Sequence, residues 1–100
     1  MVTETCDGMK GLIAEGEKTV KAEGDSAVKD AALIGAAQRV EHYEIAGYGT
    51  ARQLADDCGF DGIRDLMDET LDEESQADKL LTKIATGGMF KAGVNQQAAS

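Results

Sequence analysis

Residues 38–59 read "QRVEHYEIAGYGTARQLADDCG" and place two glutamates, Glu41 and Glu44, among alanine, valine, leucine and tyrosine. Since a helix turns by about 100° per residue, side chains three positions apart lie on nearly the same face. In a projection centred on Glu44, the residues within about 60° are mostly apolar or small. They are Leu33, Ala37, Val40, Gly47, Tyr48, Ala51, Ala55 and Cys58. The pattern predicts a long helix with a carboxylate in the middle of its apolar stripe.

The two edges and the back of this helix are equally informative. Gly47 lies at one edge of the stripe, where the missing side chain would let another helix approach closely, and Glu41 lies at the other edge. The opposite side carries mostly polar residues. They are Gln38, His42, Gly49, Gln53 and Asp56. We therefore expect His42, which is the single histidine of the chain, to point away from the stripe.

A second helix, predicted over residues 61–86, repeats the arrangement around Glu74. The residues within about 60° of Glu74 are again mostly apolar. They are Ile63, Met67, Thr70, Leu71, Ala77, Leu81 and Ala85. Asp78 lies about 40° from the centre, and Glu73 lies further out beside Leu66 and Ile84. The far face is polar and should be solvated, with Asp65, Asp68, Asp72, Gln76, Lys79 and Lys83.

The whole chain is predicted to be all-α. A leading helix over residues 7–22 precedes a long antiparallel hairpin, with helices over 26–58 and 61–86 joined at Gly59. A domain over residues 1–86 would then end in a flexible tail, residues 87–100, which is rich in glycine and small polar residues.

Composition limits the function. The formal charge of −9 gives no electrostatic reason to bind nucleic acid or an anionic membrane, but it can attract cations. The chain has no run of about 18 apolar residues that could span a membrane and no signal-peptide pattern, so the cytoplasm is the expected location. Cys6 and Cys58 form neither a metal-type CxxC pattern nor a disulfide framework, and nothing near either in sequence indicates a reactive thiol.

Carboxylates in an apolar stripe need a partner, since burying an unpaired carboxylate costs several kcal/mol or more. Neither stripe offers a well-placed lysine or arginine, and Arg52 lies just outside the border. A metal ion is the other candidate. The predicted ligands are Glu41, Glu44 and Glu74, with Glu73 or Asp78 as further candidates. The alternative is that the glutamate stems simply reach water at the edge of the stripe. Tyr48 could support a ligand carboxylate or serve only in packing.

Three strings, "GLIAEGEKTV", "VKDAALIGAAQRVEHYEIAGYGTARQLA" and "LDEESQADKLLTKIA", resemble the second half of the ferritin-like YciE/YciF family of bacterial stress proteins. The resemblance covers about residues 6–85. It implies a ferritin-like four-helix bundle with a di-iron-type site, and it implies iron or manganese as the metal.

The chain departs from the family in two respects. The helical hairpin that precedes this region in full-length members is missing, so the chain is expected either to be a fragment or to form a homodimer, or a higher homo-oligomer, that rebuilds four helices. Ferritin-like sites also commonly use Glu-x-x-His, in which a histidine follows a glutamate by three residues. In this chain the residue three after Glu41 is Glu44, and the residue three after Glu74 is Ala77. A site here would be almost purely carboxylate, and two chains would supply enough oxygens for two metal ions.

Two functions remain open at this point. The first is a metal-binding protein with a role in oxidative stress or iron handling, and with possible ferroxidase-like or peroxide-consuming chemistry if iron is bound. The second is a helical association module, or a truncated fragment of a longer protein, without a working metal site.

Overall fold

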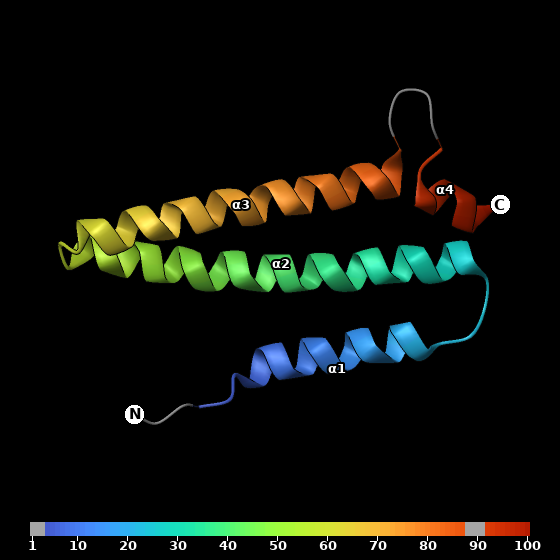
Figure 1. Cartoon of the computed structure of the whole chain (residues 1–100), viewed down its shortest axis with the longest axis horizontal. Coiled ribbons are helices and arrows are strands. Elements are labelled where there is room, and N and C mark those ends of the chain that lie inside the picture. The colour runs from blue at the N-terminus through green and yellow to red at the C-terminus, as the bar shows by residue number, and fades with distance from the viewer. Residues whose placement is uncertain (1–3, 88–91) are drawn as a thin grey trace.

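The computed structural model of the chain describes residues 4–87 and 92–100, and every regular element in those ranges is a helix (Figure 1). The all-α prediction is confirmed. The helices are α1 (Asp7–Lys21), α2 (Ser26–Asp57), α3 (Asp61–Thr86) and α4 (Val94–Ala99). No helix in the described ranges is both long and apolar enough to cross a membrane.

The hairpin of α2 and α3 follows from local capping and turn chemistry. The side chain of Asp25 accepts a hydrogen bond from the Val28 N–H at 3.1 Å and so caps the start of α2. At the other end, Gly59 adopts φ +77°, a left-handed conformation that glycine allows without a steric penalty. The Phe60 N–H then bonds to the Ala55 carbonyl at 2.8 Å, and α3 starts at the next residue and runs back along α2.

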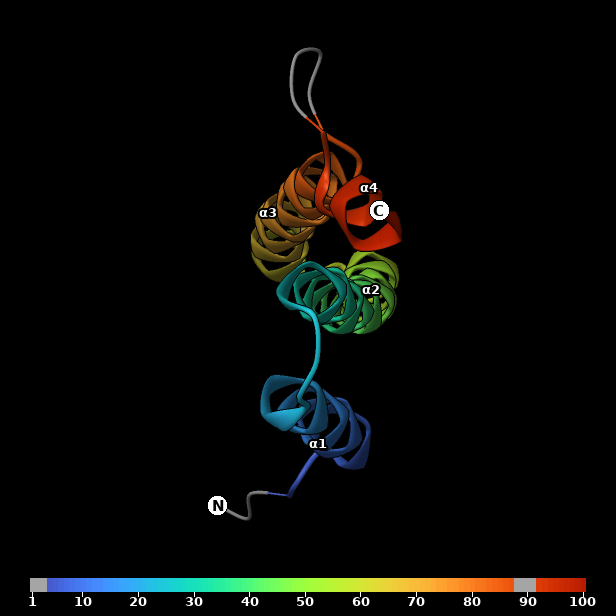
Figure 2. The same cartoon turned by 90° about the vertical axis from the view of Figure 1, so that its right-hand side faces the viewer.

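α1, α2 and α3 form a single layer, and α4 packs against both α2 and α3 at one end of it (Figure 2). α1 packs along one side of α2 and α3 packs along the other, so that α2 is the central helix (Figures 1 and 2). The Cα envelope measures 52 × 35 × 14 Å. In a layer this thin the hydrophobic core is small. Among the apolar residues of the described ranges, only Ala36, Ala55 and Ala85 are buried.

The C-terminal segment differs from its prediction as a flexible tail over residues 87–100. Residues Val94–Ala99 form α4, which packs against α2 and α3. Gly93 makes this possible, since a side chain there would collide with the backbone of Ala85 and Thr86. The Gln96 side chain accepts a hydrogen bond from the Gly93 N–H at 3.1 Å and caps the short helix.

The faces of α2 also differ from the projection. Gln38 and His42, expected on the side opposite the stripe, reach α3, where Gln38 Nε2 lies 3.2 Å and His42 Nε2 lies 2.9 Å from Asp78 Oδ1. Tyr43, on the other flank of α2, contacts α1. The physical reason is that α1 and α3 pack on the two flanks of α2. The centre of the stripe around Glu44 therefore lies between the two flanks, and Gly47 and Ala51 within it are exposed.

Candidate metal centre

Three glutamates of the hairpin converge near the middle of α2 and α3. Glu41 and Glu44 project from adjacent turns of α2, and Glu74 projects from α3. One carboxylate oxygen of each lies within 4.8 Å of the others, and all three residues are half-buried. Three of the five ligands predicted from the sequence are thus brought together. We call Glu41, Glu44 and Glu74 the glutamate cluster.

Two oxygens of the glutamate cluster are buried without a hydrogen-bond partner. They are Oε2 of Glu41 and Oε2 of Glu74. A buried carboxylate oxygen without a donor loses its hydration and gains nothing in return, which destabilises the charged form. Each of these oxygens is therefore available to a cation or to a proton.

The pKa shifts within the glutamate cluster also favour a bound cation or proton. The pKa of Glu44 is raised, first because its protonated carboxyl would hydrogen-bond to Glu74, and then by burial and by the charge of Glu74. The pKa of Glu74 is raised chiefly by the corresponding hydrogen bond with Glu41, and this outweighs the hydrogen bond with Glu44, which lowers it. The close approach of the carboxylates therefore disfavours ionisation of Glu44 and Glu74 unless a positive charge compensates.

Basic side chains do not supply that charge. Arg52, the nearest candidate in the sequence, pairs instead with Asp68 at 3.0 Å. Arg39 pairs with Glu15 at 3.7 Å. In residues 4–87 and 92–100, no ion pair involves a member of the glutamate cluster.

The remaining two predicted ligands lie outside the cluster. The Asp78 carboxylate accepts a hydrogen bond from Gln38 and pairs with His42, so it links α3 to α2. Glu73 is exposed, and its charge contributes to the raised pKa of Glu74 without its side chain joining the cluster. The helical projection placed both acids near the stripe, but it could not show which neighbour each would contact.

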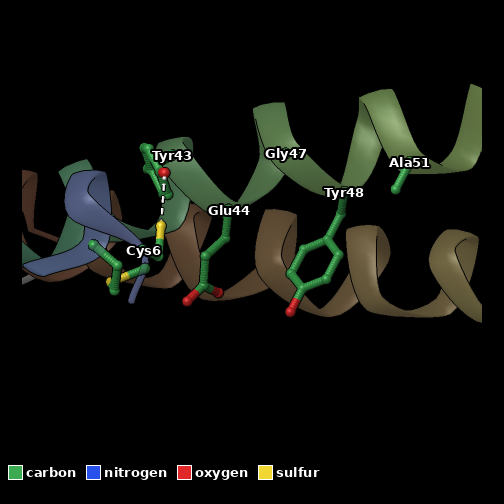
Figure 3. A pocket seen from close by; sticks show the side chains of 7 residues that line it. Cys6, Tyr43, Glu44, Gly47, Tyr48 and Ala51 are labelled. Carbon is green, nitrogen blue, oxygen red and sulfur yellow. Dashed lines mark hydrogen bonds between the residues drawn. The ribbon is translucent and has the colours of Figure 1, made fainter. Parts of the chain in front are cut away.

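An open groove of about 400 Å³ runs beside the cluster. Residues of α2 and the start of α1 line it, and the Glu44 carboxylate and the Tyr48 hydroxyl point to the same side of α2 (Figure 3). The lining residues are Cys6, Met9, Tyr43, Glu44, Gly47, Tyr48 and Ala51. One member of the cluster is thus directly accessible from this groove.

Sequence reasoning missed one contact at the end of this groove. The Cys6 sulfur lies 3.0 Å from the Tyr43 hydroxyl, as the dashed line in Figure 3 shows. The hydrogen bond with Tyr43 lowers the pKa of the Cys6 thiol and raises the pKa of Tyr43 itself, a coupling that nothing near Cys6 in the sequence indicated. Gly8 permits this contact, because a side chain there would collide with the Tyr43 ring. Both cysteines are free and exposed.

The glutamate cluster fits a hard cation. Carboxylate oxygens suit magnesium, calcium, manganese and iron, whereas thiolate or imidazole ligands would favour softer metals. The fit rests on the two buried oxygens without donors and on the spacing of the three carboxylates. Ligand atoms from this chain alone would leave coordination positions for water or for oxygens of a second molecule.

Comparison with known proteins identifies relatives over almost the whole chain. The sequence pattern described as "Domain of unknown function (DUF892)" matches residues 1–99. Protein YciF of Escherichia coli (strain K12) is 44% identical over 91 residues, which cover 91% of this chain and 55% of that protein. The crystal structure of the E. coli stress protein YciF superposes with a TM-score of 0.80 at 45% identity, covering 82% of this chain and 52% of that one. The chain thus spans about half the length of the relatives that it matches, and the resemblance in the sequence is confirmed.

Proposed function

Because this chain belongs to the DUF892 family and its hairpin carries the glutamate cluster, we propose that it is a metal-binding helical domain with a role in stress response or iron handling. Glu41, Glu44 and Glu74 are the ligands. Iron and manganese are the metals that match an all-oxygen ligand set in a helical bundle. The stress role rests on the relative described as a stress protein.

The observation that carries this proposal is the pair of buried oxygens on Glu41 and Glu74 without a hydrogen-bond donor. In water each would be solvated, and in a purely structural cluster an arginine or lysine would be expected nearby. A divalent cation held by Glu41, Glu44 and Glu74 would neutralise two of the three charges. The same contacts would tie α3 to α2 in the middle of the hairpin.

If the metal is iron, the chemistry expected at such a site is the oxidation of Fe(II) by oxygen or peroxide, which suits a stress or iron-handling protein. The contribution of this chain is to hold and orient the carboxylates and to keep one side open. The groove beside Glu44 provides a route from solvent to the cluster for a small reactant.

A titration with Mn²⁺, followed by calorimetry, tests the proposal. The double variant Glu44→Gln/Glu74→Gln keeps the size of both side chains and removes their charge, so it should weaken Mn²⁺ binding at least tenfold, which corresponds to about 1.4 kcal/mol. The matched control is Glu69→Gln/Asp72→Asn, which removes two exposed charges from α3. Equal affinity of the double variant and the wild type would contradict the proposal.

The second candidate function is a helical association module without a working metal site. The thin layer of helices favours it. If this function is correct, Mn²⁺ binding is weak, and the control variant lowers it as much as the double variant does, because only the net charge matters.

A further inference from the structure

No apolar side chain is buried in the middle of the hairpin, where the glutamate cluster lies. Within residues 26–86, the buried apolar residues are Ala36, Ala55 and Ala85. Ala55 lies at the closed end of the hairpin, and the other two lie toward its open end. Between these ends, the cluster sets carboxylates of α2 against a carboxylate of α3. Their mutual repulsion favours a wider separation of the two helices at this point.

A set of polar contacts joins the same two helices beside the cluster. Asp78 Oδ1 lies 3.2 Å from Gln38 Nε2 and 2.9 Å from His42 Nε2. Gln38 Nε2 also lies 2.8 Å from Thr82 Oγ1. One carboxylate of α3 is thus held between two side chains of α2. We call Gln38, His42 and Asp78 the polar clasp.

The polar clasp lies on the same stretches of helix as the candidate ligands. On α3, Asp78 follows Glu74 by four residues, which is about one turn. On α2, Gln38 precedes Glu41 by three residues, and His42 follows it directly. At about 1.5 Å per residue, each clasp residue lies within about 6 Å of a ligand along the helix axis. The separation of α2 and α3 at the clasp therefore sets their separation at the cluster.

The contacts of the clasp are suited to hold this separation. The Asp78 side chain is only 21% exposed, and a carboxylate that is shielded from water makes stronger hydrogen bonds than an exposed one. His42 can donate from Nε2 both as the neutral Nε2–H tautomer and as the cation. The clasp thus draws the two helices together where the carboxylates of the cluster push them apart.

We propose that Gln38, His42 and Asp78 are positioning residues, which hold the glutamates of α2 close to Glu74 and so make the cluster select Mn²⁺ over the larger Ca²⁺. This inference rests on the proposed function. The clasp residues lie outside the cluster, so they act through the separation of the two helices and not as ligands.

Selection by size follows from a fixed separation of the ligands. Ca²⁺ takes about 6–8 oxygen ligands at about 2.3–2.6 Å in flexible geometry, whereas smaller octahedral cations require shorter and more regular contacts. A cluster that the clasp keeps narrow favours the smaller cation. A cluster that repulsion is free to widen loses this preference, because the larger cation can then bind it equally well.

Calorimetric titrations of the whole chain with Mn²⁺ and with Ca²⁺, at neutral pH, test the inference through the ratio of the two Kd values. Gln38→Ala/His42→Ala removes both donors of the clasp and no acidic charge, and Asp78→Ala removes the acceptor. In both variants Mn²⁺ binding should weaken about 10–100-fold, as is usual when a residue that orients a metal ligand is lost. Ca²⁺ binding should weaken by a smaller factor, so the preference for Mn²⁺ should fall severalfold.

The matched control is Asp68→Ala. It removes the same charge as Asp78→Ala and also breaks a link between α2 and α3, since Asp68 pairs with Arg52. Because Asp68 lies six residues from Glu74, this change should affect both cations alike and leave the ratio of the Kd values unchanged.

A conservative variant tests the donor itself. His42→Gln keeps an N–H donor of similar reach and should retain the wild-type ratio, whereas His42→Ala should lower it. The His42 side chain is 66% exposed, so both single variants should keep the helix content of the wild type by circular dichroism. They therefore provide the test even if the double variant does not fold.

The possible outcomes separate this inference from the proposed function. Mn²⁺ binding that depends on Glu44 and Glu74, with the same ratio in the wild type and the clasp variants, overturns the positioning role but supports the metal site. Equal loss of preference in Asp68→Ala and Asp78→Ala, or in His42→Gln and His42→Ala, also overturns the positioning role. A wild type that binds both cations equally overturns the selection, and a wild type that binds no Mn²⁺ overturns both proposals.

Discussion

At the scale of single residues, Glu74 is the centre of the candidate site. It is the only member of the glutamate cluster on α3, and it meets both glutamates of α2. Its position was predictable, because it lies in the middle of an apolar stripe where a solvated glutamate has no reason to be. The exclusion of Asp78 was not predictable, because a projection gives the direction of a side chain but not the presence of Gln38 and His42 opposite it.

The contact between Cys6 and Tyr43 was beyond sequence reasoning for a similar reason. The two residues are 37 positions apart, and only the docking of α1 on α2 brings them together. The Tyr43 hydroxyl can donate a hydrogen bond to the thiolate form of Cys6, and this lowers the pKa of the Cys6 thiol.

Replacing Tyr43 by phenylalanine removes that donor. We expect the pKa of Cys6 to rise, so that the thiolate fraction and the rate of alkylation by iodoacetamide at neutral pH fall severalfold. As pH rises, the variant should approach the wild-type rate. Tyr48→Phe is the control and should leave the rate profile unchanged. An alkylation profile that is the same for Tyr43→Phe and the wild type would show that the hydrogen bond has no effect on Cys6.

At the scale of elements, the long helices were predictable and the short one was not. The sequence analysis expected helices over 7–22, 26–58 and 61–86, and the structure has them at Asp7–Lys21, Ser26–Asp57 and Asp61–Thr86. Caps and a glycine turn define those ends locally. α4 has only six residues, too few for a periodic pattern, and it depends on a tertiary contact at Gly93.

The contact at Gly93 yields a prediction for stability. Gly93→Ala places a methyl group against the backbone of Ala85 and Thr86, so α4 should separate from the hairpin and the free energy of unfolding should fall by about 1–3 kcal/mol. Gly11→Ala, in α1, is the control. Its Cβ meets open space, and the gain in helix propensity should raise stability slightly. Urea unfolding measures both. A Gly93→Ala variant as stable as the wild type would contradict the role of this close approach.

At the scale of the whole molecule, the packing of α1, α2 and α3 in one layer determines which faces of these helices are exposed. The apolar stripes of α2 and α3 were read from the sequence as faces directed toward a core. In the structure the helices pack flank to flank, and the side with the glutamate cluster remains partly open. Periodicity along one chain cannot distinguish a face that meets a neighbouring helix from one that meets a second molecule.

Native mass spectrometry of the protein, expressed in medium supplemented with iron and manganese, tests the central claim most directly. The account predicts a dimer that carries about two transition-metal ions, with the metal lost in Glu44→Gln/Glu74→Gln. A wild type that is a metal-free monomer would contradict the account.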